Sequence, residues 1–92
     1  MLNTAQHAGI AETLITRFEH QRLPYLLAIR ERVNAGELLT DADMGFLDRV
    51  LSEAMANRRL IHSIPDCQVL FARVTHLYHE ITAKALANES RK

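Results

Sequence analysis

The densest group of potential metal or proton ligands in this 92-residue chain lies near its end, in the stretch HLYHE at residues 76–80. On a helix, His76 and Glu80 are four positions apart and share a face. An imidazole and a carboxylate at that spacing could chelate one divalent cation or exchange a proton. With His79 directly before Glu80, the residue types raise the hypothesis of a metal site formed by His76, His79 and Glu80.

The helix that must carry these ligands is predicted to turn them toward water. At about 100° per residue, Leu70, Val74, Leu77 and Ile81 mark the inward face of the last segment, and His76 lies almost opposite that face. Within one chain, the acid at position 80 would then pair with residues 76 and 84 on the surface. A solvated helix face is therefore the preferred interpretation, and no cofactor is expected with it.

The alternative interpretation is a metal-binding, di-iron-like helical bundle that holds iron or another divalent metal. His-x-x-x-Glu pairs help to hold di-iron centres in hemerythrin-like bundles, and Glu-x-x-His pairs do so in ferritin-like bundles. The ligands of the C-terminal helix would be completed across a subunit interface, for example by Glu12 and Glu19 of a second chain. The sequence contains no Glu-x-x-His and no His-x-x-x-His, so the motif is incomplete and no family is assigned.

Sparse helix-breaking residues divide the chain into three segments. Gly36 suits the position just past a helix end, Thr40 is a good N-cap, and Pro65 fits the first turn of a new helix. The predicted helices cover about residues 4–35, 41–62 and 65–88, within a single domain of residues 1–92.

Apolar residues in each segment recur at steps of three and four, as on the buried side of an amphipathic helix. Period-two alternation is absent, so the sequence predicts an all-α fold, a three-helix antiparallel bundle. The predicted inward positions are Ile10, Ala11, Leu14, Ile15, Phe18, Leu26, Ile29 and Val33 in the first segment, Leu47, Val50, Leu51, Ala54 and Ile61 in the second, and Leu70, Val74, Leu77, Ile81 and Ala85 in the third.

The first segment is longer than the other two, about 48 Å against about 33 Å. Pro24 cannot donate to the carbonyl of His20, and its ring crowds that carbonyl. Because the apolar pattern continues past the proline, we expect one long helix that is kinked near Pro24. A homodimer, in which the overhang of this helix finds a partner surface, would resolve the mismatch in length.

A second apolar patch on the first helix is a candidate interface. Leu23 and Leu27 lie one turn apart and beside His20, away from the predicted inward positions of this helix. Two leucines on one ridge favour an extra contact with a partner. An equally good interpretation is that the first helix is buried on two sides by the other two.

Composition narrows the function further. Lysine plus arginine and aspartate plus glutamate each number 11, which disfavours nucleic-acid binding. No stretch is long and apolar enough for a membrane span, and the N-terminus does not resemble a signal peptide. Cys67 is the only cysteine and is expected to be a buried thiol, and the three glycines form no phosphate-binding loop. By elimination, we expect a small cytoplasmic, non-catalytic protein-interaction or assembly module.

Overall fold

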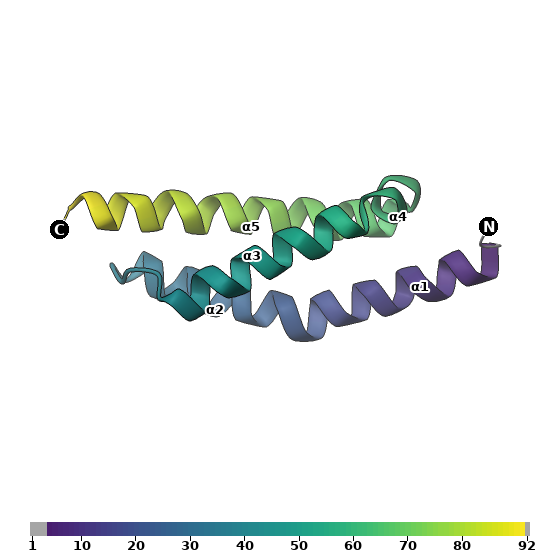
Figure 1. Ribbon diagram of the computed structural model, residues 1–92, viewed down its shortest axis with the longest axis horizontal. Helices are drawn as coiled ribbons and strands as arrows, with labels where there is room; N and C mark the ends of the chain where they lie inside the picture. Colours follow the sequence, from purple (N-terminus) through teal and green to yellow (C-terminus); the bar gives the residue numbers. More distant parts are fainter. Residues whose placement is uncertain (1–3, 92) are drawn as a thin grey trace.

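The computed structural model describes residues 4–91, with side chains from residue 9 onward, and every element in this range is helical (Figure 1). The all-α prediction is confirmed for these residues. The body is elongated, with extents of 53 × 20 × 19 Å. Its elements are α1 (Thr4–Arg17), the π-helical segment η1 (Phe18–Arg22), α2 (Leu23–Asn34), α3 (Asp41–Ala56), α4 (Arg58–Ser63) and α5 (Pro65–Ser90).

The helices subdivide more finely than the sequence predicted. The first predicted segment contains α1, η1 and α2, and the second contains α3 and α4, separated at Asn57. In η1 the backbone N–H of Leu23 donates to the carbonyl of Phe18, five residues back instead of four. A π turn of this kind places one extra residue in the helix. Nothing in the apolar periodicity had predicted it.

The helices pack side by side along the long axis. In Figure 1, α1 and α2 together span the molecule, α5 runs beside them in the same direction, and α3 runs back and crosses them obliquely. The α5 helix contacts both α1 and α2. Within residues 4–91, no helix combines the length and the apolar character that a membrane crossing requires.

The turn between α2 and α3 is formed by the residues that the sequence analysis identified there. Gly36 has φ +97°, which residues with a side chain rarely adopt, and its N–H donates to the carbonyl of Val33. The N–H of Glu37 donates to the carbonyl of Arg32, which completes a Schellman motif. Thr40 then caps α3, because its hydroxyl accepts from the Asp43 N–H while the Asp43 carboxylate accepts from the Thr40 N–H. The predicted roles of Gly36 and Thr40 are confirmed.

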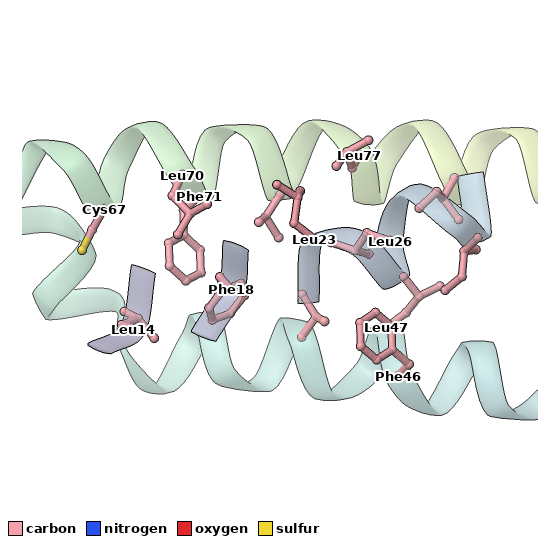
Figure 2. Packing of buried hydrophobic residues seen from close by; sticks show 14 of the residues in the cluster. Leu14, Phe18, Leu23, Leu26, Phe46, Leu47, Cys67, Leu70, Phe71 and Leu77 are labelled. Carbon is pink, nitrogen blue, oxygen red and sulfur yellow. The ribbon is translucent and has the colours of Figure 1, made fainter. Parts of the chain in front are cut away.

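The apolar core runs between α5 on one side and α3 on the other, and side chains from α1, η1 and α2 lie between them (Figure 2). Two aromatic pairs join the elements: the rings of Phe18 and Phe71 are 4.9 Å apart, and those of Tyr25 and Phe46 are stacked at 4.0 Å. The buried residues are Ala11, Leu14, Phe18, Leu23, Leu26, Ile29, Val33, Phe46, Leu47, Val50, Cys67, Leu70, Phe71, Val74, Leu77, Ile81 and Ala85.

Two predicted inward positions are in fact exposed. Ile10 and Leu51 were expected to face the core, but they are 41% and 46% exposed. Leu51 follows the fully buried Val50 and is therefore turned about 100° away from it on α3. In α3 the buried positions centre on Val50, so Leu51 lies outside the buried arc.

Two arginine–carboxylate pairs attach α3 to the first helical segment. Arg22 donates to both carboxylate oxygens of Glu53, at 2.6 and 3.3 Å, and Arg32 donates to both oxygens of Asp43, at 2.6 and 3.0 Å. The Asp43 side chain is almost fully buried. Hydrogen bonds from Arg32, and after them those from Thr40, lower the pKa of Asp43 below its usual value although burial opposes this.

Asn88, near the end of α5, is the second buried polar side chain among residues 9–91. Its amide nitrogen donates to the carbonyl of Val33 at 2.7 Å and to the carbonyl of Glu37 at 3.0 Å. Its oxygen accepts from Arg91. These bonds connect the last turns of α5 to the end of α2 and to the turn that follows.

Asn88→Ala should lower the free energy of unfolding by about 1–3 kcal/mol, because it removes one buried and one partly buried hydrogen bond and leaves the two carbonyls under-satisfied. The matched control is Asn34→Ala at an exposed helical site, for which we expect a change within about 0.5 kcal/mol. Chemical denaturation of both variants measures the difference. Equal midpoints for Asn88→Ala and the control would show that the amide is not structurally important.

Asp43→Asn should destabilise the protein near neutral pH by about 1–3 kcal/mol, since it removes a charged acceptor from Arg32. The lowered pKa in the folded state means that the carboxylate stabilises the fold above its unfolded pKa of about 3.9, and that this stabilisation is lost as pH falls through the folded pKa. The difference between wild type and variant should therefore shrink below about pH 4. Denaturation at pH 7 and pH 3 tests this, with the exposed Glu31→Gln as control. A difference independent of pH would contradict the assignment.

Candidate functional site

In the histidine–glutamate group of α5 both histidines are exposed and Glu80 is partly exposed. The Nε2 atom of His76 is 3.6 Å from an Oε2 atom of Glu80, and the His76 side chain is 80% exposed. His79 is also exposed, with its ring edge-on to that of Tyr78 at 6.2 Å between centroids. The prediction that His76 faces water is confirmed. The structure thus pairs His76 with Glu80 and leaves His79 outside the pair.

The group that meets Glu80 from a second helix is a cation. Arg30 of α2 approaches the Glu80 carboxylate to 3.7 Å. A guanidinium at this place would repel a divalent cation, and it already pairs with the carboxylate that such a cation would need as a ligand. Among the residues with described side chains, no three histidine, cysteine, aspartate or glutamate residues are grouped so that they could hold a metal. The metal hypothesis therefore requires ligands from a second chain, as the sequence interpretation assumed.

Glu12 and Glu19, the acids considered as completing ligands, are both exposed on α1 and η1. Arg58, at the start of α4, also lies at the surface. At the contact with α3, Arg22 of η1 donates to the carboxylate of Glu53.

The three residues predicted to form an interface differ in their solvent exposure. His20 and Leu27 are exposed, whereas Leu23 is 7% exposed and belongs to the core. On an uninterrupted helix Leu23 would lie roughly 140° from Phe18. The additional residue of η1 turns the following helix back by roughly 100°, which brings Leu23 to the same side as Phe18. Figure 2 shows both side chains directed into the core.

Cys67 is fully buried in the first turn of α5 and belongs to the apolar core (Figure 2). Burial, and to a smaller extent the nearby Asp66 carboxylate, raises the pKa of the thiol. A thiol with a raised pKa and no exposure is a poor nucleophile, because the thiolate is the reactive form. The expectation of a buried structural cysteine is confirmed.

An apolar surface centred on α3 was not found from the sequence. Met44, Leu51 and Met55 are spaced by seven and four residues, so they lie within about 40° of one another on the helix. They are 49%, 46% and 58% exposed. The methionine spacing was the available signal, and the sequence interpretation counted only the inward positions of this segment.

The row formed by Met44, Leu51 and Met55 is called the α3 ridge. A hollow lies at each end of this ridge, and each hollow is also lined by a residue of a neighbouring helix. A hollow of about 610 Å³ lies at the C-terminal end of α3, where Met55 and Ile10 of α1 line it together with Arg58 and Arg59. A second hollow of about 320 Å³ lies at the other end, where Met44 of α3 and Leu86 of α5 line it. Ile10, Met44, Leu51, Met55 and Leu86 are called the α3 face below.

No protein-family model matches this chain, and neither a curated protein nor a solved structure shows significant similarity to it.

Protein purified without an affinity tag should carry no stoichiometric metal, because the group that approaches the His76–Glu80 pair from a second helix is the Arg30 guanidinium and not a further ligand. His76→Ala should leave the unfolding midpoint within the range of surface substitutions, about ±0.5 kcal/mol. Native mass spectrometry and elemental analysis report the metal content, and Thr75→Ala at the neighbouring exposed position is the matched control. One metal ion per chain or per dimer, lost in His76→Ala only, would establish the metal-binding alternative.

Proposed function

We propose that this chain is a non-catalytic protein-interaction or assembly module that works as a homodimer. The observation that carries the proposal is the α3 face. Five of the eight large apolar residues exposed within residues 9–91 belong to it, from α1, α3 and α5. Apolar side chains that gather along one side of a small protein mark a site of protein contact, whereas scattered single residues do not.

The size of the chain supports the same conclusion. A domain of about 90 residues buries only a modest share of its surface, and its core supplies limited stability. The elongated shape, 53 Å long and about 20 Å thick, makes the surface larger still for this mass. Association with a second copy would remove apolar surface from water and add to the stability of the folded chain.

The proposed module is a single domain of residues 1–92 that acts as a three-helix antiparallel bundle. In this description α1, η1 and α2 form one long first helix, kinked near Pro24. The balanced charge of the chain favours a protein partner over nucleic acid or an anionic membrane surface, and we assign the module to the cytoplasm. The exposed Leu27 and His20 offer a further contact for a second partner, beside the buried Leu23.

The chemistry of the described side chains supports a binding role over catalysis. The thiol of Cys67 is buried, whereas His76 is exposed and the Glu80 carboxylate is partly exposed beside Arg30. Catalytic groups act in a concave, water-excluding site in which several of them converge. The apolar α3 face offers contact area instead.

Sedimentation equilibrium of the wild-type chain should give twice its mass of 10.5 kDa at micromolar concentration. The midpoint of thermal unfolding should also rise with protein concentration, because association stabilises the folded state by mass action. A mass of one chain up to about 100 μM, with a midpoint independent of concentration, would sink the homodimer. That pair of measurements needs no substitution, so it is independent of which surface the partner uses.

A further inference from the structure

We infer that the second copy docks on the α3 face through its own α3 face, with the two α3 helices antiparallel about a twofold axis. This inference rests on the proposed homodimer and specifies its partner surface and orientation. A twofold contact uses the same patch on both chains, so the patch must be complementary to itself.

The charges around the α3 face have that self-complementarity. Asp41 and Asp48 are exposed in the first half of α3, on the flank of the ridge, whereas Arg58 and Arg59 line the hollow beside Met55 at the other end. An antiparallel arrangement places the acidic end of each chain against the basic end of the other. A parallel arrangement would place acid against acid and base against base, which is unfavourable.

One register satisfies the apolar and the charged groups together. If Met44 lies opposite the partner's Met55, the register is symmetric about the midpoint between residues 49 and 50. Asp41 at the start of α3 then lies near the end of the partner's α3, where Arg58 and Arg59 line the hollow beside Met55. Leu51 is then offset from the partner's Leu51 by roughly 4.5 Å along the helix axis. Leucine at the centre and methionine on both sides form a compact apolar strip, and the flexible methionine side chains fill irregular gaps.

The two hollows fit this arrangement, since they lie at opposite ends of the ridge. The twofold operation that superposes one end of α3 on the other brings the partner's Leu86 toward the hollow beside Met55. It also brings the partner's Ile10 toward the hollow beside Met44. Each hollow thus receives an apolar side chain that is exposed in the isolated chain, where Leu86 is 65% and Ile10 is 41% exposed.

The available area is adequate. A stable interface buries roughly 800 Å² on each partner, about an eighth of the 6261 Å² that this chain exposes. A long face of 53 by 20 Å can supply that area along α3 and its flanks. The other exposed large apolar residues, Tyr25, Leu27 and Val69, are outside this surface.

The first test replaces an apolar residue near the proposed axis by a charged one. Leu51→Asp would place two carboxylates close together in the contact, and we expect the dimer dissociation constant to rise on the order of 100-fold. The matched control is Val69→Asp, a change of the same kind at an exposed site on α5, which should leave the constant unchanged. Circular dichroism of both variants checks that the helices remain. A folded Leu51→Asp variant that dimerises like wild type would overturn the inference.

The second test measures orientation by disulfide formation. Leu51→Cys should cross-link to itself under mild oxidation, since this register offsets its two copies by only roughly 4.5 Å along the helix axis. Met44→Cys alone should not, because its two copies are roughly 16 Å apart along the helix in the antiparallel register. A mixture of Met44→Cys and Met55→Cys should cross-link. Wild type controls for Cys67, which is buried.

The outcomes separate the two levels of the proposal. Strong self-cross-linking of Met44→Cys without the mixed product would show a parallel pair and contradict the stated orientation. A wild-type dimer in which neither Leu51→Asp nor the cysteine pairs have any effect would refute the α3 surface and leave the homodimer standing. A wild-type monomer would refute the homodimer itself.

Discussion

The structure depends on one constraint: the buried apolar residues between positions 11 and 33 must face the same direction along most of a body 53 Å long. A regular helix would not achieve this with the present sequence. In such a helix the buried positions of α2 would be rotated about the helix axis relative to those of α1, so both sets could not face the core. The π turn of η1 removes the difference, so that Phe18 before the proline and Leu23 and Leu26 around it all reach the core. Pro24 lacks an N–H and already weakens the helix at this point. The irregular turn therefore lies where a regular one is least favourable.

Polar interactions then fix how the other helices pack against these buried apolar residues. Apolar contacts are not directional and would tolerate sliding, whereas the hydrogen bonds at the end of α2 are specific. Arg32 holds the start of α3 through Asp43, and Asn88 holds the end of α5 through the carbonyls of Val33 and Glu37. All of them converge on the turn after α2. Arg22 and Glu53 provide the second attachment of α3, near its other end. With both ends attached to the first helical segment, α3 crosses obliquely, and its ridge of methionine and leucine remains uncovered.

The parts of the fold that could be predicted are those decided by local chemistry. Gly36 and Thr40 were assigned correctly, because a positive φ and an N-cap each require particular residue types. The burial of Leu23 and the exposure of Leu51 were not predicted from the sequence, for two reasons. The first depends on a π turn, which changes the phase of the helix and has no simple sequence signal. The second depends on which flank of α3 the neighbouring helices cover, and the Arg22–Glu53 and Arg32–Asp43 pairs help to fix that by attaching α3 to the first helical segment. For the candidate site, the exposure of His76 followed from the helical wheel, whereas Arg30 as the partner of Glu80 did not.

The two hypotheses for this protein need different dimers. Glu80 lies on the side of α5 that faces α2, as its contact with Arg30 shows, whereas Leu86 lies on the side that faces the start of α3, as the hollow that it shares with Met44 shows. A second copy docked on the α3 face would therefore approach the opposite flank of α5 and would bring no ligand to His76 and Glu80. A metal centre would need a partner across α2 and α5, where a cation already occupies the carboxylate. The apolar surface and the charge pattern both favour the α3 contact, so the geometry of the dimer decides between an assembly module and a metal protein.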